Sequence, residues 1–409
     1  MRYHADALSI GLFNDSYPPI MDGVAMMVRN TARYLVEDGI PTTVVTPEVP
    51  GRRPGPVPVV EYASLPFPGR APYRLGTPWL DRTIRGRIES IPFDIVHAHC
   101  PFSSGKLALA TARSRGIPIV ATMHSRYLED FRRAVRVEWL ARRLLSRIVG
   151  FYESVDEVWV PNESTRSVLE SYGYHGPIAV QRNGTEMARP DAATRDRLRI
   201  AGRKALDIGD DRTVGLYVGQ QRFEKNVGLI IGALGRMQRH GTPTPLTVLV
   251  GEGPDIEAFR SQANKVGIEH TTRFTGLIEE RSRMEEVFAA SDFFVFPSTY
   301  DTDGIVVTEA AAFALPSIVV KDSGPGSRID HGRNGLVCDA TERSIADAME
   351  TLSRDAPFRA QLGRRAAIDL YRSATDATSE TYARYQALVG RSHECRPDRA
   401  PIASTSIPD

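Results

Sequence analysis

The stretch DTDGIVVTEA places two carboxylates, Asp301 and Glu309, eight positions apart. It follows FFVFPS, an apolar run typical of a buried strand, and a helix is expected to begin at Gly304 or Ile305. The start of such a helix offers free N–H groups and partial positive charge, which suit a diphosphate. One turn further, Glu309 would accept two ribose hydroxyls, and Asp301 would reach a sugar ring. Taken alone, the stretch favours a simpler interpretation, with Asp301 as a turn residue and Glu309 as a solvated helix residue.

The stretch YVGQQRFEKN (217–226) carries two cations, Arg222 and Lys225, directly after another predicted strand. A guanidinium fork and an ammonium point charge in one loop suit a phosphate clamp. A solvated loop with an ion pair between Arg222 and Glu224 is the alternative. Lysine is rare in this chain, at positions 106, 204, 225, 265 and 321 only, which favours a functional role for Lys225.

Two features of the first half have the same position, just after a predicted strand. Gly23, in NDSYPPIMDGVAMMVRN (14–30), would let backbone approach a ligand at a helix start, or Asp22 is simply the N-cap. His124, in PIVATMHSRY, would contact a substrate hydroxyl or is a core histidine. His97 and His99 in IVHAHCP have no acidic or cysteine partners at ligand spacing, so no metal site is expected.

The alternation of short apolar runs with helix-like segments predicts parallel α/β sheets. Near-continuous apolar runs fit strands that are covered on both faces. Helices are expected over 23–38, 103–115 and 162–172. Strands are expected at 7–13, 41–47, 94–99, 118–124, 157–162 and 178–184, and again at 213–219, 246–253, 272–277, 293–298 and 316–321.

A length of 409 residues and two successive series of strands predict two doubly wound domains, with ligands at the carboxyl ends of the strands. A cleft between facing domains is the default site. The expected organisation is a first domain over 1–185, a linker over 186–211, a second domain over 212–374, a helix over 375–390 that crosses back to the first domain, and a disordered tail over 391–409.

Composition excludes several function classes. Lysine and arginine number 51 against 50 acidic residues, so nucleic acid is not an expected partner. The three cysteines are widely spaced, which favours a reducing compartment. GEGPDI (251–256) lacks the last glycine of a dinucleotide fingerprint. We therefore expect a cytoplasmic protein that does not bind NAD.

The segment FRRAVRVEWLARRLLSRIVGFYE (131–153) is expected to form a basic amphipathic helix. Such a helix can lie on an anionic membrane, which would place the protein peripherally at the inner face of the membrane. The favoured alternative is a surface helix that packs its apolar stripe on its own sheet. The arginines on the polar face are Arg132, Arg136, Arg143 and Arg147, and the apolar positions are 137, 140, 141, 144, 145, 148 and 149.

The order of these motifs resembles glycosyltransferase family 4, the retaining nucleotide-sugar transferases with the GT-B fold. The resemblance extends from about residue 7 to about residue 390. It implies two Rossmann-like domains that face each other across a cleft, a UDP- or GDP-sugar donor, a hydroxyl acceptor, and neither cofactor nor metal. Its most specific pieces are YPPIMDGV, DEVWVPNEST, EKN, FTGL and FPSTYDTDGIVVTEAAAFALP.

The resemblance also implies roles for single residues. Catalytic roles fall to His124 and Asp301 near the reacting sugar and to Lys225 at the leaving diphosphate. Donor binding falls to Gly23, Arg222, Lys225, Gly304, Ile305 and Glu309, with the backbone at Leu277 and Ile278 meeting the base. Two positions depart from the family pattern: Asp301 replaces the usual Glu, and Gln220 replaces the usual Arg, so Arg222 is the substitute cation.

The acceptor stays open at this point: a lipid headgroup, a glycan and a small-molecule or secondary-metabolite alcohol all fit. Two other functions also remain possible, a related GT-B enzyme such as a nucleotide-sugar epimerase and a non-catalytic sugar-binding protein. The Pro- and Arg-rich region between 50 and 90 either shapes the acceptor pocket or is a long surface loop.

Overall fold

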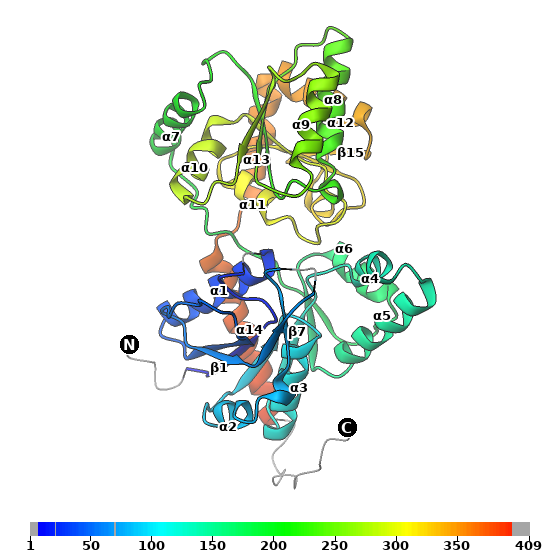
Figure 1. The fold of residues 1–409 in the computed structure, drawn as a ribbon. Coiled ribbons are helices and arrows are strands. Elements are labelled where there is room, and N and C mark those ends of the chain that lie inside the picture. Colours follow the sequence, from blue (N-terminus) through cyan, green and yellow to red (C-terminus); the bar gives the residue numbers. More distant parts are fainter. Residues whose placement is uncertain (1–6, 21, 69–70, 395–409) are drawn as a thin grey trace. The chain divides into compact units, whose positions relative to one another are not determined.

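The computed structural model describes residues 7–20, 22–68 and 71–394 (Figure 1). The chain forms two compact units. Within the described residues, the first unit comprises the chain up to Asn183 and from Ala374 on, and the second runs from Gly184 to Ser373. Each unit is built on its own parallel sheet, as the alternation of apolar runs predicted.

The first unit has a seven-stranded sheet in the order β3-β2-β1-β6-β7-β8-β9, and all neighbouring strands are parallel. Six of these strands match the predicted runs, and β3 is an additional edge strand from a Pro-rich segment. The bounds are β1 Ile10–Phe13, β2 Thr42–Pro47, β3 Val59–Tyr62, β6 Ile95–Ala98, β7 Ile119–Thr122, β8 Glu157–Val160 and β9 Ile178–Val180.

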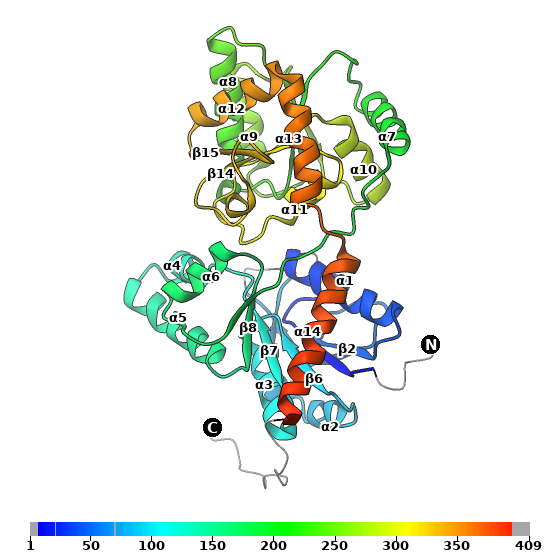
Figure 2. The same cartoon turned by 180° about the vertical axis from the view of Figure 1, so that it is seen from behind.

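Helices cover both faces of this sheet. One face packs against α1 (Gly23–Glu37) and α14 (Ala374–Glu394), and Figure 2 shows α14 lying along the strands. The Tyr385 hydroxyl on α14 lies 2.5 Å from His97 Nδ1, and Arg384 donates to Glu157 over 2.7 Å. The other face carries α2 (Ile84–Glu89), α3 (Ser103–Arg115), α4 (Tyr127–Val135), α5 (Glu138–Tyr152) and α6 (Glu163–Ser171).

Helix α14 extends beyond the segment 375–390 for which a helix was expected. It continues to Glu394, so the expectation of disorder from residue 391 was wrong for its first four residues. The remainder, 395–409, lies outside the described residues.

The single basic helix expected over 131–153 was also wrong. The segment forms the end of α4 and the whole of α5, with a break at Arg136, which adopts a left-handed conformation with φ of 51°. Leu145, Ile148 and Val149 are buried in the core of the first unit, so the apolar stripe of α5 packs on its own sheet. None of the described helices has the length and hydropathy that a membrane crossing needs.

The region between 50 and 90 contains ordered elements. It includes β3, the antiparallel hairpin of β4 (Ser64–Pro66) and β5 (Arg74–Gly76), the 3₁₀ turn η1 (Pro78–Leu80) and α2.

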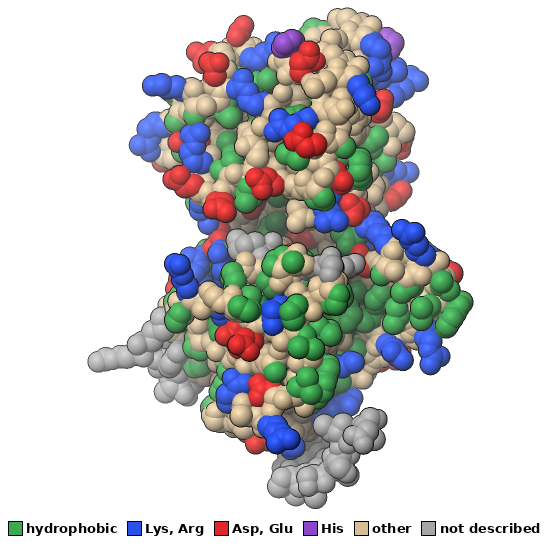
Figure 3. Space-filling model, viewed as in Figure 1, with side chains coloured by type: hydrophobic (Ala, Val, Ile, Leu, Met, Phe, Trp, Pro, Cys, Tyr) green, Lys and Arg blue, Asp and Glu red, His purple; other side chains and the backbone are tan. Residues whose placement is uncertain are grey.

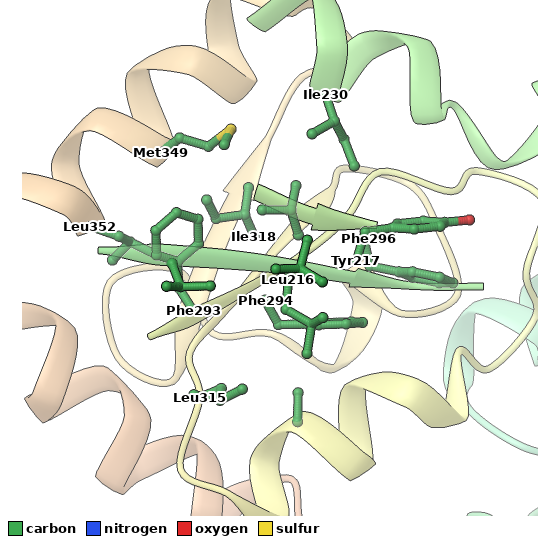
Figure 4. Close-up of a cluster of buried hydrophobic side chains, with 14 of the residues drawn as sticks. Leu216, Tyr217, Ile230, Phe293, Phe294, Phe296, Leu315, Ile318, Met349 and Leu352 are labelled. Atoms are coloured by element: carbon green, nitrogen blue, oxygen red, sulfur yellow. The ribbon is translucent and has the colours of Figure 1, made fainter. Parts of the chain in front are cut away.

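The second unit has a six-stranded parallel sheet in the order β12-β11-β10-β13-β14-β15. In Figure 4, Ile230 and Met349 pack on one side of these strands and Leu315 on the other, so the sheet is covered on both faces. The strands are β10 Val214–Val218, β11 Leu246–Val250, β12 Thr272–Gly276, β13 Phe293–Phe296, β14 Ser317–Val320 and β15 Gly335–Cys338. The helices are α7 Ala192–Ala205, α8 Val227–Arg239, α9 Ile256–Val266, α10 Arg281–Ala290, α11 Ile305–Ala312, α12 Glu342–Arg354 and α13 Ala356–Asp369, with short turns η2 Phe223–Lys225 and η3 Gly326–Arg328.

The polar segment 186–211 contains α7 and belongs to the second unit. Asp191 caps this helix by accepting from the Thr194 N–H over 2.7 Å. Arg199 donates to Asp292 over 2.8 Å, and a Cβ at Gly202 would lie 2.1 Å from the Glu286 carbonyl oxygen. The segment is therefore packed closely against α10.

Candidate active site

Lys225 and Asp301 meet at the carboxyl edge of the second sheet. Lys225 lies in the loop after β10, and Asp301 lies in the loop after β13. Because β10 and β13 are neighbours in the sheet, these loops are adjacent. Lys225 Nζ donates to Asp301 Oδ1 over 2.6 Å. Asp301 Oδ2 is buried and accepts no hydrogen bond from any described residue, so half of the hydrogen-bonding capacity of this carboxylate is unused.

The two loops are held by further hydrogen bonds. The Asn226 amide donates from Nδ2 to the Pro297 carbonyl over 3.0 Å. The Asp301 N–H donates to Ser298 Oγ over 3.4 Å. Lys225 Nζ also lies 5.6 Å from the centre of the Tyr300 ring. The ammonium group is thus positioned by a carboxylate, an aromatic face and its own loop.

Helix α11 begins at Ile305, as predicted. Gly304 is its N-cap, with φ of 64°, a conformation that favours glycine. A Cβ at this position would lie 2.5 Å from Pro325 Cγ, so the loop of η3 packs directly on the helix start. Glycine has no side chain that could cap the helix, and no side-chain cap is formed at Gly304. The N–H groups of the first turn are therefore available to an anion.

A buried ion pair, which no sequence motif indicates, stabilises this helix start. Arg328 Nη1 donates to Asp303 over 3.1 Å, and Nη2 donates to Thr308 over 2.7 Å and to the Leu370 carbonyl over 3.4 Å. The side chains of Arg328 and Asp303 are only 7% and 10% exposed. Asp303 lies within the stretch DTDGIVVTEA (301–310), but no sequence pattern connects it with Arg328.

Glu309 lies on the second turn of α11 and is partly accessible. Its Oε1 accepts a hydrogen bond from Thr185 Oγ1 over 3.4 Å. Removal of water by the surrounding protein raises the pKa of Glu309 to about 7, although the charge of Arg281 acts in the opposite direction. Glu309 therefore changes its protonation state close to neutral pH, unlike a solvated glutamate.

Arg222 and Ile278 have different surroundings from Lys225. Arg222 is 45% exposed, and its Nε lies 3.5 Å from Glu224, which is the ion pair expected of a solvated loop. Ile278 follows β12 and packs partly buried against the core of the second unit, whereas the neighbouring Leu277 is 57% exposed. The side chain of Ile278 thus anchors the loop.

Gly23 is the first residue of α1 in the first unit. A Cβ at Gly23 would meet no atom of the described residues within 4 Å, so none of these residues covers the helix start at Gly23. Asp22 is the N-cap and accepts from the Ala25 N–H over 2.8 Å. The two interpretations of this loop are therefore compatible: Asp22 caps the helix, and Gly23 leaves its backbone approachable.

His124 follows β7 and belongs to a group of three histidines. His124 Nε2 lies 3.3 Å from His99 Nδ1, and the ring centres of His97 and His99 are 3.9 Å apart. Burial lowers the pKa of His124 to about 4, so the imidazole is neutral at pH 7. His97 is a core residue, with hydrogen-bonding contacts to Tyr385 and Thr122. Among the described residues, no group of His, Cys, Asp and Glu side chains is arranged to hold a metal.

Each unit is a doubly wound parallel sheet, and in the second unit the start of α11, where an anion can bind, lies at the carboxyl edge of the sheet. Two such units define the GT-B glycosyltransferase fold. The crystal structure of Anabaena Alr3699/HepE in complex with UDP and glucose superposes with a TM-score of 0.72 at 16% identity and covers 93% of this chain and 99% of that chain. At this identity the likeness concerns the fold.

Sequence comparisons add the family. Residues 21–189 match the model of Glycosyltransferase Family 4, and residues 199–369 match that of Glycosyl transferases group 1. Glycogen synthase of Mycobacterium tuberculosis is 31% identical over 77% of this chain and 74% of its own. Alpha-monoglucosyldiacylglycerol synthase of Streptococcus pneumoniae is 28% identical over 76% of this chain and 70% of its own. The chain belongs to glycosyltransferase family 4 and is a glycosyltransferase.

Proposed function

We propose that this glycosyltransferase moves a hexose-type sugar from a UDP- or GDP-sugar to a hydroxyl acceptor and retains the anomeric configuration. The observation that carries the proposal is the Lys225–Asp301 pair beside the start of α11, with one Asp301 oxygen unpaired among the described residues. The UDP and glucose in the complex of the similar Anabaena protein support a nucleotide-sugar donor.

The donor diphosphate binds the N–H groups at Gly304 and Ile305, where the helix dipole favours negative charge. Lys225 neutralises the charge that grows on the leaving diphosphate, and Arg222 contributes from the exposed side of the loop. Glu309 accepts the ribose hydroxyls, and the backbone at Ile278 meets the base. Asp301 accepts a hydroxyl of the donor sugar through its unpaired oxygen.

The reaction breaks the bond between the anomeric carbon and the diphosphate oxygen and forms a bond from that carbon to the acceptor oxygen. The acceptor attacks on the face that the diphosphate leaves, and its proton passes to a phosphate oxygen of the leaving group. The protein contributes positioning and electrostatic stabilisation. Since Lys225 and Arg222 supply positive charge, we expect activity to persist in EDTA.

We also propose that the backbone at Gly23 approaches the diphosphate and that His124 contacts the donor sugar near the reacting carbon. A neutral imidazole with its pKa near 4 acts as a hydrogen-bonding group and adds no charge at pH 7.

A lipid headgroup is the acceptor class that we favour among hydroxyl acceptors. The similar S. pneumoniae protein is named for the synthesis of a glucosylated diacylglycerol. We accordingly propose a cytoplasmic enzyme that binds the inner face of the membrane peripherally, through the basic face of 131–153.

Calorimetric titration with UDP and GDP tests the donor site. We expect one nucleotide to bind, and Glu309→Ala and Lys225→Ala to weaken its binding. Unchanged affinity in Glu309→Ala would contradict the ribose role, and no binding of either nucleotide would contradict the proposed donor.

Product analysis with the donor alone tests the reaction class. Slow hydrolysis with retention of configuration, in buffer containing EDTA, is the expected result. An epimerised nucleotide sugar would identify an epimerase, and an unchanged donor together with tight sugar binding would identify a non-catalytic binding protein.

A further inference from the structure

Large hydrophobic side chains are exposed mainly on one part of the first unit. Among the described residues, thirteen such side chains are exposed, and nine of them lie between residues 65 and 139. We call these nine the apolar surface. They are Leu65, Phe67, Tyr73, Leu75, Trp79, Leu80, Phe102, Val137 and Trp139.

The elements that carry the apolar surface touch one another. Ser103 at the start of α3 donates from its hydroxyl to the Gly76 carbonyl at the end of β5 over 2.8 Å. The ring centre of the neighbouring Phe102 lies 6.0 Å from that of Tyr127 on α4, and the ring centre of Tyr127 lies 6.3 Å from that of Phe131. Contacts through the buried Tyr127 thus connect the elements of the hairpin with the α4–α5 corner, where Figure 3 shows hydrophobic side chains gathered and basic ones around them.

The exposure is not explained by packing within the unit. Leu65 and Leu75 face each other across the β4–β5 hairpin, yet they are 52% and 43% exposed. Trp79 and Trp139 are 69% and 68% exposed. Exposed apolar patches of this kind mark interaction sites in soluble proteins.

The charge of the same segments indicates which kind of partner the apolar surface binds. Segments 64–89 and 126–147 contain twelve arginines and five acidic residues, whereas the whole chain has 51 basic and 50 acidic residues. Arg132 and Arg142 pair with Glu138. Arg143 and Arg147 on α5 are exposed and make no ion pair within the described residues. An isologous contact with a second copy of the chain would bring these like charges together, which is unfavourable.

We propose that the apolar surface and the arginines Arg143 and Arg147 bind an anionic bilayer interface. Tryptophan, tyrosine and phenylalanine partition into the headgroup region, and arginine attracts anionic lipid. The β4–β5 hairpin with η1 is thus a second segment of the proposed membrane contact, in addition to α5. Its role in bringing the enzyme to a lipid-borne acceptor rests on the proposed function.

Tryptophan fluorescence tests the contact directly. The chain has three tryptophans, and the third, Trp159, is 1% exposed and serves as a constant background. Trp139→Phe therefore isolates Trp79, and Trp79→Phe isolates Trp139. With vesicles of phosphatidylglycerol and phosphatidylcholine, we expect a blue shift in both variants and quenching by brominated lipid. No response of either tryptophan at low salt would overturn the proposal.

Vesicle flotation with surface variants supplies matched controls. Two double variants should each lower partitioning onto phosphatidylglycerol vesicles about tenfold or more. One combines Trp79→Ser with Leu80→Ser, and the other combines Arg143→Glu with Arg147→Glu. Ile200→Ser, at a side chain that is 70% exposed on α7, and Arg195→Glu on the same helix should leave partitioning unchanged. Equal losses in the control variants would contradict the assigned surface.

Two further measurements separate the alternatives. Light scattering that shows a dimer, lost in the Trp79→Ser variant, would assign the surface to a second copy of the chain and overturn the membrane proposal. Because flotation is measured without donor and UDP titration without vesicles, the two proposals fail independently: UDP binding without flotation refutes the membrane surface alone, and flotation without nucleotide binding refutes the donor site alone.

Discussion

Lys225 and Asp301 are 76 residues apart in sequence, and the Lys225 ammonium group lies 2.6 Å from the Asp301 carboxylate. The family resemblance gives them separate roles, one at the diphosphate and one at the sugar. The structure joins them, because their loops follow adjacent strands. Asp301 therefore helps to position Lys225, in addition to the ligand role that we propose for it. The shorter side chain of Asp301, compared with the usual Glu, still reaches this partner.

The first prediction concerns this pair. Lys225→Ala should lower kcat/KM by about 10²–10³, because the growing charge on the leaving diphosphate loses its nearest cation. Asp301→Asn should lower it by about 10–100-fold, since the amide keeps the shape but loses the charge. The double variant should lose less than the product of the two factors, because the residues are coupled. Steady-state kinetics of all three variants check this, and simple additivity would refute the coupling.

The second prediction concerns pH. The pKa of Glu309 is raised to about 7, and ribose hydroxyls require the ionised carboxylate as acceptor. Nucleotide binding at pH 7 should thus release about half a proton, and affinity should rise between pH 6 and 8. Calorimetry in buffers with different ionisation enthalpies measures this release. Glu309→Gln should bind more weakly and release none, so unchanged proton release in that variant would contradict the assignment.

The same shift predicts a change in stability with the opposite slope. Because the folded pKa lies above the value of the unfolded chain, folding favours the protonated carboxyl, and this contribution is lost as the pH rises from 4.5 to about 7. Thermal melts without ligand should show a smaller decrease over this pH range for Glu309→Gln than for the unaltered protein.

The third prediction concerns the buried ion pair under α11. Arg328→Leu removes the buried cationic partner of Asp303 and should lower the free energy of unfolding of the second unit by about 3–5 kcal/mol. Asp303→Asn combined with Arg328→Leu should recover part of that loss. Arg333→Leu is the control, because Arg333 is 56% exposed and pairs at the surface, where the loss should stay below about 1 kcal/mol. Urea unfolding checks the order, and an equal loss in the control would contradict it.

The fourth prediction separates the two cations of the 217–226 loop. Arg222 is 45% exposed and lies beside Glu224, so Arg222→Ala should weaken donor binding less than about tenfold. Lys225→Ala should weaken it more. UDP titrations of both variants measure the difference, and a larger loss for Arg222→Ala would reverse the assigned roles.

Much of the candidate site was predictable because its signals are local. Apolar runs identify strands, and the residues that follow parallel strands lie at one edge of the sheet, so Lys225, Asp301 and the start of α11 could be placed before the fold was known. Arg328 escaped because its partnership with Asp303 depends on how η3 packs on α11. No spacing rule connects two loops that are 25 residues apart.

Some errors have a clear physical origin. The periodicity of 131–153 is helical throughout, but it does not encode the break at Arg136, which requires an unusual φ angle. The region between 50 and 90 is expected either to shape an acceptor pocket or to be a surface loop, because composition does not decide which side chains are buried. Only the packing reveals that Trp79 is 69% exposed.

By itself, the sequence determined the two parallel-sheet units, the positions of most strands and the residue types at the candidate site, because periodicity and loop composition act over short distances. The tertiary structure alone decided which of these residues meet: Lys225 with Asp301, Arg328 with Asp303, and His124 with His99. It also decided that Glu309 has a pKa near 7, because desolvation depends on all the atoms that surround a group.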